Sequence, residues 1–208
     1  MLENFLTSAG IAFITLFPLV NPIGAVPVFI SLASDFEADY RAQQARKTAV
    51  NVAIILIVFF FVGELLLRFF GISIYVLKIA GGLIIAHTAW EMVTSKSKLS
   101  REEDTESQSK SDISFTPLAI PMLSGPGSIG AVITLSSHEQ NVFSYLGASA
   151  GIILIGVASY ICLKLATPLF KLLGKTGVGV LNRIMGFFIL AIAVGLITEG
   201  IKAVFQIK

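Results

Sequence analysis

Charged residues are scarce in this sequence of 208 residues, of which only 13% are Asp, Glu, Lys or Arg. A soluble domain usually carries about 25% charged residues, so the composition excludes an ordinary soluble protein. Uncharged apolar stretches of about 20 residues are typical of transmembrane helices. The formal net charge of +2 is too small to predict a nucleic-acid partner. Five long stretches contain no formal charge, and they cover residues 4–34, 48–63, 113–138, 140–163 and 184–198.

Cysteine, histidine and the common catalytic motifs are also nearly absent. Cys162 is the one cysteine, so the chain cannot form an internal disulfide. His87 and His138 are far apart in the sequence, and neither has a second ligand at the spacing of a metal site. The sequence contains no phosphate-binding glycine loop, no Gly-x-Ser-x-Gly motif and no His-Glu-x-x-His motif. We therefore expect no metal, no cofactor and no enzymatic activity.

The apolar stretches predict six transmembrane helices and an all-α integral membrane protein. Residues 95–111 are rich in serine and charge, with Leu99 as their one large apolar side chain. Such a segment buries too little apolar surface to offset the entropy of ordering it. We therefore expect a first three-helix unit at residues 1–94, a flexible cytoplasmic linker at 95–114 and a second three-helix unit at 115–208. The predicted helices cover residues 5–33, 48–70, 74–94, 115–137, 144–170 and 180–203.

The two units repeat each other. Two pairs of segments match in the same order along the two units. Leu67–Gly71 matches Phe170–Gly174, and Lys78–Gly81 matches Arg183–Gly186. With three spans in each unit, the second copy must enter the bilayer from the opposite side, which predicts inverted repeats like those of many secondary transporters. The alternative is a duplication kept only for packing. The clearest match is in the prolines, six of seven of which form two triplets with spacings of four and five residues: Pro18, Pro22 and Pro27, then Pro117, Pro121 and Pro126.

The distribution of Lys and Arg predicts the orientation in the membrane. Of the 15 such residues, 11 fall on one side of the predicted topology. Because cytoplasmic loops carry the excess of Lys and Arg, we expect that side to face the cytoplasm. Both termini then face outward, away from the cytoplasm. The remaining four basic residues, on the outer side, are Arg68, Lys78, Lys202 and Lys208.

The proline triplets predict interruptions in the first and fourth helices. Proline removes a backbone donor and clashes with the carbonyl one turn back, and the freed carbonyls persist in a membrane only where they are buried in protein or line a wet cavity. Each span is therefore expected to be two half-helices joined near the middle of the bilayer. The N–H groups that start a half-helix attract a carboxylate, and the carbonyls that end one attract an ammonium group or a cation, which together suit a small zwitterion. The candidate substrate-binding residues are Asn21, Pro22, Gly24, Ser124, Gly125, Pro126, Gly127 and Ser128.

Three ionisable residues are candidates for gating or coupling. Lys78 and Arg183 have matching positions at the start of the third and sixth helices, where a cation opposes the helix dipole. They predict a gate or an ion pair, or else they extend to the membrane interface. Glu64 lies inside the second helix, where it could pair with Arg68 four residues later or relay protons. Three residues near helix ends are interpreted as interfacial: His87, Glu91 and Glu199.

These motifs resemble the MarC family of six-helix bacterial membrane proteins, which is classed with the neutral amino acid transporters. The resemblance covers nearly the whole chain. It implies a protein of the cytoplasmic membrane with periplasmic termini, and it implies glycine and alanine as substrates, since some members are similar to carriers of these amino acids. The motifs that carry it are Pro18–Pro22, Gly71–Ile74 followed by Leu77–Ile84, Pro117–Pro121 with Gly125–Gly127, and Arg183–Phe187.

We therefore expect a secondary transporter that moves a small neutral amino acid, similar to glycine or alanine, by alternating access. The substrate site is expected between the interruptions of the first and fourth helices. The sequence does not specify whether transport is coupled to H⁺ or Na⁺, and it does not specify the oligomeric state. The alternatives are an exporter of other small solutes or drugs, a non-transporting membrane scaffold and, least favoured, an intramembrane enzyme.

Overall fold

The structure is a computed structural model that describes residues 1–94, 112–138 and 141–206, and this part of the chain contains helices and no strand. Five of these helices are long and apolar enough to cross a membrane, and a sixth span results if η1 and α6, which meet at 67°, are taken together. The prediction of an all-helical membrane protein is thereby confirmed. In chain order the elements are α1 (Leu2–Val20), α2 (Val26–Leu32), α3 (Ala38–Phe69), α4 (Ile74–Val93), η1 (Ser114–Leu123), α6 (Pro126–His138), α7 (Val142–Lys164) and α8 (Ala166–Phe205).

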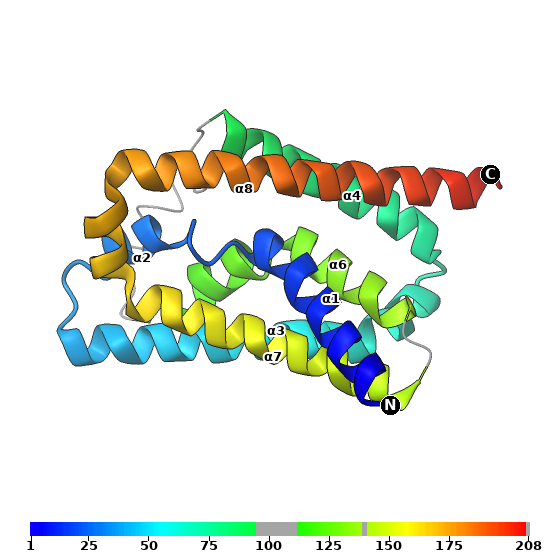
Figure 1. Cartoon of the computed structure of the whole chain (residues 1–208), viewed down its shortest axis with the longest axis horizontal. Helices are drawn as coiled ribbons and strands as arrows, with labels where there is room; N and C mark the ends of the chain where they lie inside the picture. The colour runs from blue at the N-terminus through cyan, green and yellow to red at the C-terminus, as the bar shows by residue number, and fades with distance from the viewer. Residues whose placement is uncertain (95–111, 139–140, 207–208) are drawn as a thin grey trace.

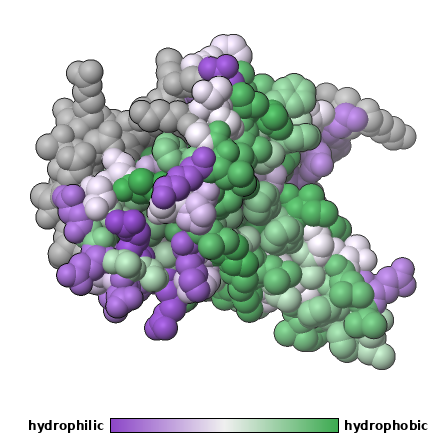
Figure 2. All heavy atoms as spheres, turned by 60° about the vertical axis from the view of Figure 1, so that its left-hand side comes forward, coloured by the Kyte–Doolittle hydropathy of each residue, from purple (hydrophilic) through white to green (hydrophobic). Residues whose placement is uncertain are grey.

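The outer surface of the helices is apolar. Phe61, Phe69, Leu146 and Phe187 are each more than half exposed, and many smaller apolar residues accompany them. Soluble monomers rarely expose contiguous apolar patches of more than a few hundred Å². Figure 2 shows hydrophilic residues gathered toward one end of the molecule and hydrophobic residues covering the face beside it. This distribution indicates a protein whose helices lie in lipid for most of their length.

Both termini lie at the same end of the molecule (Figure 1). The start of α3 and the turn from α7 into α8 lie at the opposite end. α4 and α8 run side by side along one edge, and the remaining helices form the larger part of the molecule. Of the predicted linker at 95–114, residues 95–111 lie outside the described residues.

Three helix boundaries differ from the predictions. α3 begins at Ala38 instead of residue 48, because its first turns contain polar residues that are good helix formers, such as Gln43 and Arg46. Hydropathy marks only the apolar part of such a helix. α7 ends at Lys164 instead of residue 170, and α8 begins directly afterwards instead of at residue 180. The backbone at Gly174 (φ 64, ψ 176) separates the first turns of α8 from its apolar span.

Buried apolar side chains form two separate clusters. The larger one joins α1, α2, α3, η1, α6 and α7 around Leu16, Phe29, Phe60, Leu118 and Ile152, and it also takes in the first turns of α8 through Ala166. We call these six elements the core unit. The smaller cluster joins α4 and α8, which we call the α4–α8 unit. Its buried members are Ile85, Ala89, Met92, Ile189 and Ala193.

Small residues let the helices of each unit approach closely. In the core unit, a Cβ built on Gly151 of α7 would lie 2.6 Å from the carbonyl oxygen of Ala9 and 2.8 Å from Cβ of Ala12 in α1. In the α4–α8 unit, a Cβ on Gly186 would lie 3.1 Å from the carbonyl oxygen of Ala89. Close backbone approach at small residues is a common basis of helix packing in membranes.

The start of η1 is attached to α3 by polar contacts. The N–H of Ile113 donates to Oε1 of the buried Gln44 at 3.1 Å. Asp112 pairs with Lys47 at 2.8 Å and accepts from the Ser114 hydroxyl at 2.6 Å. The Lys47 ammonium and then the Ser114 hydroxyl hold the pKa of Asp112 well below its ordinary value, because both stabilise the carboxylate. These contacts fix where η1 begins and therefore where it meets α6.

Candidate functional site: a pocket beside the η1–α6 bend

α1 ends at an asparagine that turns the chain. Asn21 has a left-handed backbone (φ 47, ψ 61), and its N–H donates to the carbonyl of Phe17 at 2.9 Å. Asparagine adopts this conformation more readily than most residues. Its side-chain oxygen accepts from the N–H of Gly24 at 3.1 Å, and a Cβ on Gly24 would collide with the Asn21 amide. The helix resumes in α2 at Val26, with Pro27 in the first turn, where its missing N–H has no helical partner to lose.

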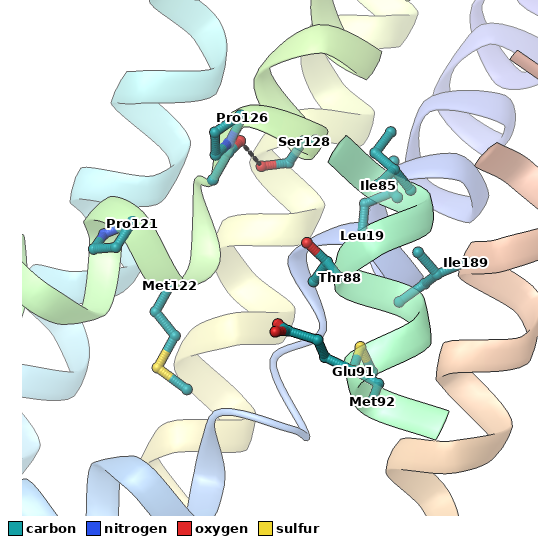
Figure 3. A pocket seen from close by; sticks show the side chains of 12 residues that line it. Leu19, Ile85, Thr88, Glu91, Met92, Pro121, Met122, Pro126, Ser128 and Ile189 are labelled. Carbon is teal, nitrogen blue, oxygen red and sulfur yellow. Dashed lines mark hydrogen bonds between the residues drawn. The ribbon is translucent and has the colours of Figure 1, made fainter. Parts of the chain in front are cut away.

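η1 and α6 meet at Ser124 and Gly125 in the bend of 67°. The N–H of Ser124 donates to the carbonyl five residues earlier at 2.7 Å, which closes a wide turn. A Cβ on Gly125 would lie 2.8 Å from the carbonyl oxygen of Pro121, so the bend requires glycine here. The Ser128 hydroxyl lies 3.0 Å from the carbonyl oxygen of Gly125 (Figure 3) and 3.3 Å from that of Leu123. The bend is thus stabilised by contacts within the chain.

A pocket of about 230 Å³ lies beside this bend, between the α4–α8 unit and the core unit. Its walls come from α4, from the η1–α6 bend, from the last turn of α1 and from α8 (Figure 3). Most of the lining is apolar side chain or backbone, and its polar side chains are those of Thr88, Glu91 and Ser128. The complete lining is Leu19, Ile85, Thr88, Glu91, Met92, Pro121, Met122, Gly125, Pro126, Gly127, Ser128 and Ile189.

Four of the eight candidate binding residues line this pocket, and all four come from the second interruption: Gly125, Pro126, Gly127 and Ser128. The other four are buried outside its lining: Asn21, Pro22, Gly24 and Ser124. The Asn21 amide is engaged elsewhere, because it donates to Oδ1 of Asn182 in α8 at 3.5 Å and to the sulfur of Met92 in α4 at 3.9 Å. Asn21 therefore joins the core unit to both helices of the α4–α8 unit. Within the described residues, the Ser124 hydroxyl is buried without a hydrogen-bond partner.

The candidate coupling residues lie outside the lining of the pocket. Glu64 forms an ion pair with Arg68 at 2.6 Å on the exposed side of α3, which is one of the two roles predicted for it. Lys78 is buried and pairs with Glu199 of α8 at 3.1 Å, although Glu199 itself is 63% exposed. Arg183 is exposed near the middle of α8. The ion pair of Lys78 is thus part of the contact between α4 and α8.

Two polar residues of the pocket were missed by sequence reasoning, Thr88 and Glu91 of α4. Glu91 is predicted only to be interfacial, which stays a prediction; in the structure its carboxylate and the Thr88 hydroxyl are turned toward η1 and the start of α6 (Figure 3). One signal was present in the sequence: Glu91 lies in the last turn of its helix, where the macrodipole disfavours a negative charge. Asn182, the partner of Asn21, carried no such signal.

In the described part of the chain, no group of three His, Cys, Asp or Glu side chains is arranged to hold a metal ion. Among the described residues that line the pocket, Glu91 is the one ionisable side chain, so this lining does not match the residue patterns of common enzymes. That the protein acts without a metal, a cofactor or enzymatic chemistry stays a prediction.

Comparison with known proteins agrees with this membrane architecture. A family described as MarC family integral membrane protein matches residues 6–205. The chain belongs to the MarC family. The UPF0056 membrane protein YvbG of Bacillus subtilis is 36% identical over 94% of each chain, and YhcE of Escherichia coli is 35% identical over 93% of this chain and 91% of its own. A UPF0056 membrane protein of Pyrococcus abyssi is 35% identical over the full length of both chains.

No solved structure matches this MarC family chain. The resemblance recognised in the sequence motifs is confirmed, and the protein is an integral, multi-pass membrane protein.

Proposed function

We propose that this MarC family protein is a secondary transporter that carries a small neutral amino acid, of the size of glycine or alanine, across the cytoplasmic membrane. The observation that carries the proposal is the pocket of about 230 Å³ between the α4–α8 unit and the core unit. Pockets for drug-sized ligands are usually about 300–1,000 Å³. A smaller pocket favours a small solute over the drugs considered as an alternative cargo.

The start of α6 provides one half of a zwitterion site. The first N–H groups of a helix have no carbonyl partner in the same helix and carry partial positive charge. In α6 these include the N–H groups of Gly127 and Ser128. Both residues line the pocket. Helix N-termini of this kind commonly bind anions, which suits the carboxylate of an amino acid.

The packing of the helices supports two inverted repeats. α1 packs on α7, and η1 and α6 pack on α3, which is the same relationship between the first span of one unit and the middle span of the other. α4 and α8, the last spans of the two units, pack on each other. They are antiparallel, because Gly186 faces Ala89 near the end of α4 while Gly200 faces Tyr75 near its start. These pairings are those expected from a pseudo-two-fold axis in the membrane plane.

The interruption between α1 and α2 and the bend between η1 and α6 are then equivalent breaks in the first spans of the two repeats. Pro27 and Pro126 hold the same place, in the first turn of the helix that follows each break. Non-helical backbone at membrane depth is tolerated where it is buried or lines a cavity. One break lines the pocket, and the other reaches its wall through the contact of Asn21 with Met92.

The separation into two units supports alternating access. The buried cluster of α4 and α8 is distinct from the larger cluster, which α8 joins only through Ala166 and its neighbours before the kink at Gly174, and the pocket lies between the two units. Two units that are each well packed can rotate against each other without disrupting either core, as the repeats of secondary transporters do around a central site. Access to the pocket would then change from one side of the membrane to the other.

The basic residues support the orientation with both termini outside. Cytoplasmic segments next to spans are enriched in Lys and Arg. The end of the molecule that holds the termini has few of these residues, with Arg68 and Lys202 near the ends of their helices. The opposite end has more: Arg41, Arg46 and Lys47 in the first turns of α3, and Lys164 at the end of α7.

Uptake of radiolabelled alanine into proteoliposomes tests the proposal. We expect saturable uptake that is slower in the Gly127→Ala variant, because the added methyl would lie 2.7 Å from Cγ1 of Ile85 and would narrow the pocket. The matched control is Gly10→Ala in α1, where the methyl meets nothing within 4 Å among the described residues. Absence of saturable flux of any small neutral amino acid with correctly inserted protein would contradict the proposal and favour a non-transporting scaffold.

A further inference from the structure

We propose that Glu91 binds the ammonium group of the substrate, so that the pocket selects solutes that carry a protonated primary amine. This inference rests on the proposed function and specifies the class of solute. It starts from the composition of the pocket wall, in which Glu91 is the one ionisable side chain among the lining residues. A lone carboxylate in a pocket that is otherwise apolar or backbone gives that pocket a preference for positive charge.

The position of Glu91 on its helix is unfavourable for helix stability. Glu91 lies two residues before the end of α4 at Val93, in a turn that contains no basic residue. The carbonyls at a helix C-terminus carry partial negative charge, which repels a carboxylate and attracts a cation. The same carbonyl charge would add to the attraction of Glu91 for an ammonium group.

The carboxylate of Glu91 retains capacity for a ligand. Its one ion-pair partner within the described residues is His87, whose Nε2 lies 4.0 Å from Oε1. That distance is longer than a hydrogen bond. His87 lies one helical turn before Glu91, and its side chain is 75% exposed. A carboxylate has two oxygens that accept hydrogen bonds, and an ammonium group has three donors.

Thr88 provides a second acceptor next to Glu91. The two residues are three positions apart on α4, so their side chains lie on one face of the helix, and both line the pocket (Figure 3). The Thr88 hydroxyl donates its hydrogen to the carbonyl of Ile84 at 3.1 Å. Its lone pairs are therefore available to accept from an ammonium group.

Glu91 and the start of α6 belong to different walls of the same pocket, one on the α4–α8 unit and the other on the core unit. A zwitterion bound between them would place its ammonium group at Glu91 and its carboxylate at the N–H groups of Gly127 and Ser128. A solute that lacks the amine, such as propionate, could reach the same N–H groups, but it has no ammonium group to offset the repulsion between its carboxylate and that of Glu91. The substrate would thus link the two units whose movement the transport cycle requires.

Binding calorimetry on the full chain in nanodiscs tests this assignment with three probes of similar size: alanine, ethylamine and propionate. We expect the wild type to bind alanine and ethylamine but not propionate. Glu91→Gln should weaken alanine and ethylamine about 10- to 100-fold, since it removes a charged hydrogen-bond partner with little change of shape. Thr88→Val, which removes only the neutral acceptor, should weaken the same two probes by a smaller factor. The control is Glu3→Gln, which neutralises an exposed carboxylate outside the pocket and should leave binding unchanged.

The possible results distinguish the role of Glu91 from the transport of amino acids. Unchanged binding of alanine in Glu91→Gln, or binding of propionate as tight as that of alanine in the wild type, would overturn the role of Glu91 but not transport of amino acids. Binding of ethylamine but not alanine, lost in Glu91→Gln, would support the role of Glu91 and contradict the amino acid substrate. A wild-type protein that binds none of the probes would contradict both.

Discussion

Lys78 of α4 and Glu199 of α8 form an ion pair in which Nζ lies 3.1 Å from Oε2. The lysine is almost fully buried, with 7% of its side chain exposed, whereas the glutamate is 63% exposed. An ion pair between the two helices, together with the close contacts of Gly186 and Gly200, joins α4 to α8 along most of their length. The α4–α8 unit is therefore expected to move as one body.

Removal of this ion pair should weaken the α4–α8 unit. In Glu199→Gln the buried ammonium of Lys78 loses an anionic partner, and the free energy of unfolding in bicelles should fall. Because Glu199 is largely exposed, the coupling energy in a double-mutant cycle with Lys78→Met should be modest, about 0.5–2 kcal/mol. The cycle is measured by thermal or denaturant unfolding of the four proteins. Fully additive single-variant effects would show that the pair contributes nothing to the contact between α4 and α8.

The contact between α1 and α7 should be sensitive to a single methyl group. Gly151→Ala would bring a Cβ to 2.6 Å from the carbonyl oxygen of Ala9, which cannot move without shifting the backbone of α1. Overpacking of this kind costs about 1–3 kcal/mol, which should appear as a lower midpoint of thermal unfolding. Gly10→Ala is the matched control, because its methyl meets nothing within 4 Å among the described residues and alanine favours a helix. Equal stability of the two variants would contradict the packing of α1 on α7.

The attachment of η1 to α3 should depend on pH through Asp112. The carboxyl has a lower pKa in the folded protein than its ordinary value of about 3.9. Its contribution to stability is therefore complete above about pH 4 to 5 and is lost as the pH falls through the folded pKa. We expect the wild type to be more stable than Asp112→Asn at pH 7 and the difference to shrink toward pH 3. The measurement is thermal unfolding across this range, with Lys47→Met as a second variant that removes the same ion pair. A difference that stays constant with pH would show that the ionised Asp112 does not stabilise the fold.

The helical membrane fold and the family were predictable because both depend on local composition. Uncharged stretches of membrane length predict spans, and the motifs around Pro18 and Pro117 carry the family resemblance. The start of α3 was not predictable in the same way, because its first turns are helical but polar and extend beyond the apolar stretch. The early start of α8 at Ala166 was not predictable from hydropathy, because the kink at Gly174 separates the first turns of the helix from its apolar span.

The pocket was predictable on one side only. Proline and glycine mark a break in a helix wherever they occur together, so the wall formed by Gly125, Gly127 and Ser128 could be predicted from the sequence. The opposite wall depends on how α4 packs against α6, a long-range contact that helical periodicity does not specify. Glu91 could have been found from its position against the helix dipole, whereas nothing in the sequence indicated that Asn182 would meet Asn21.

In the proposed transport cycle, a small amino acid crosses the membrane through the pocket as the α4–α8 unit moves against the core unit. The two units touch at Gly81 of α4 and Gly130 of α6, where a Cβ on Gly130 would lie 3.9 Å from Cα of Gly81 and a Cβ on Gly81 meets nothing within 4 Å among the described residues. Gly81→Cys and Gly130→Cys, combined with Cys162→Ser, should therefore form a disulfide, since bonded cysteines have Cα atoms about 4.4–6.8 Å apart.

Alanine flux through this double-cysteine protein in proteoliposomes, measured before and after reduction, tests whether the two units must move. We expect the oxidised protein to be inactive and reduction to restore saturable flux, with the Cys162→Ser protein unaffected by either treatment. Equal alanine flux in the oxidised and reduced forms would contradict movement between the units, and absence of flux in both would contradict transport itself.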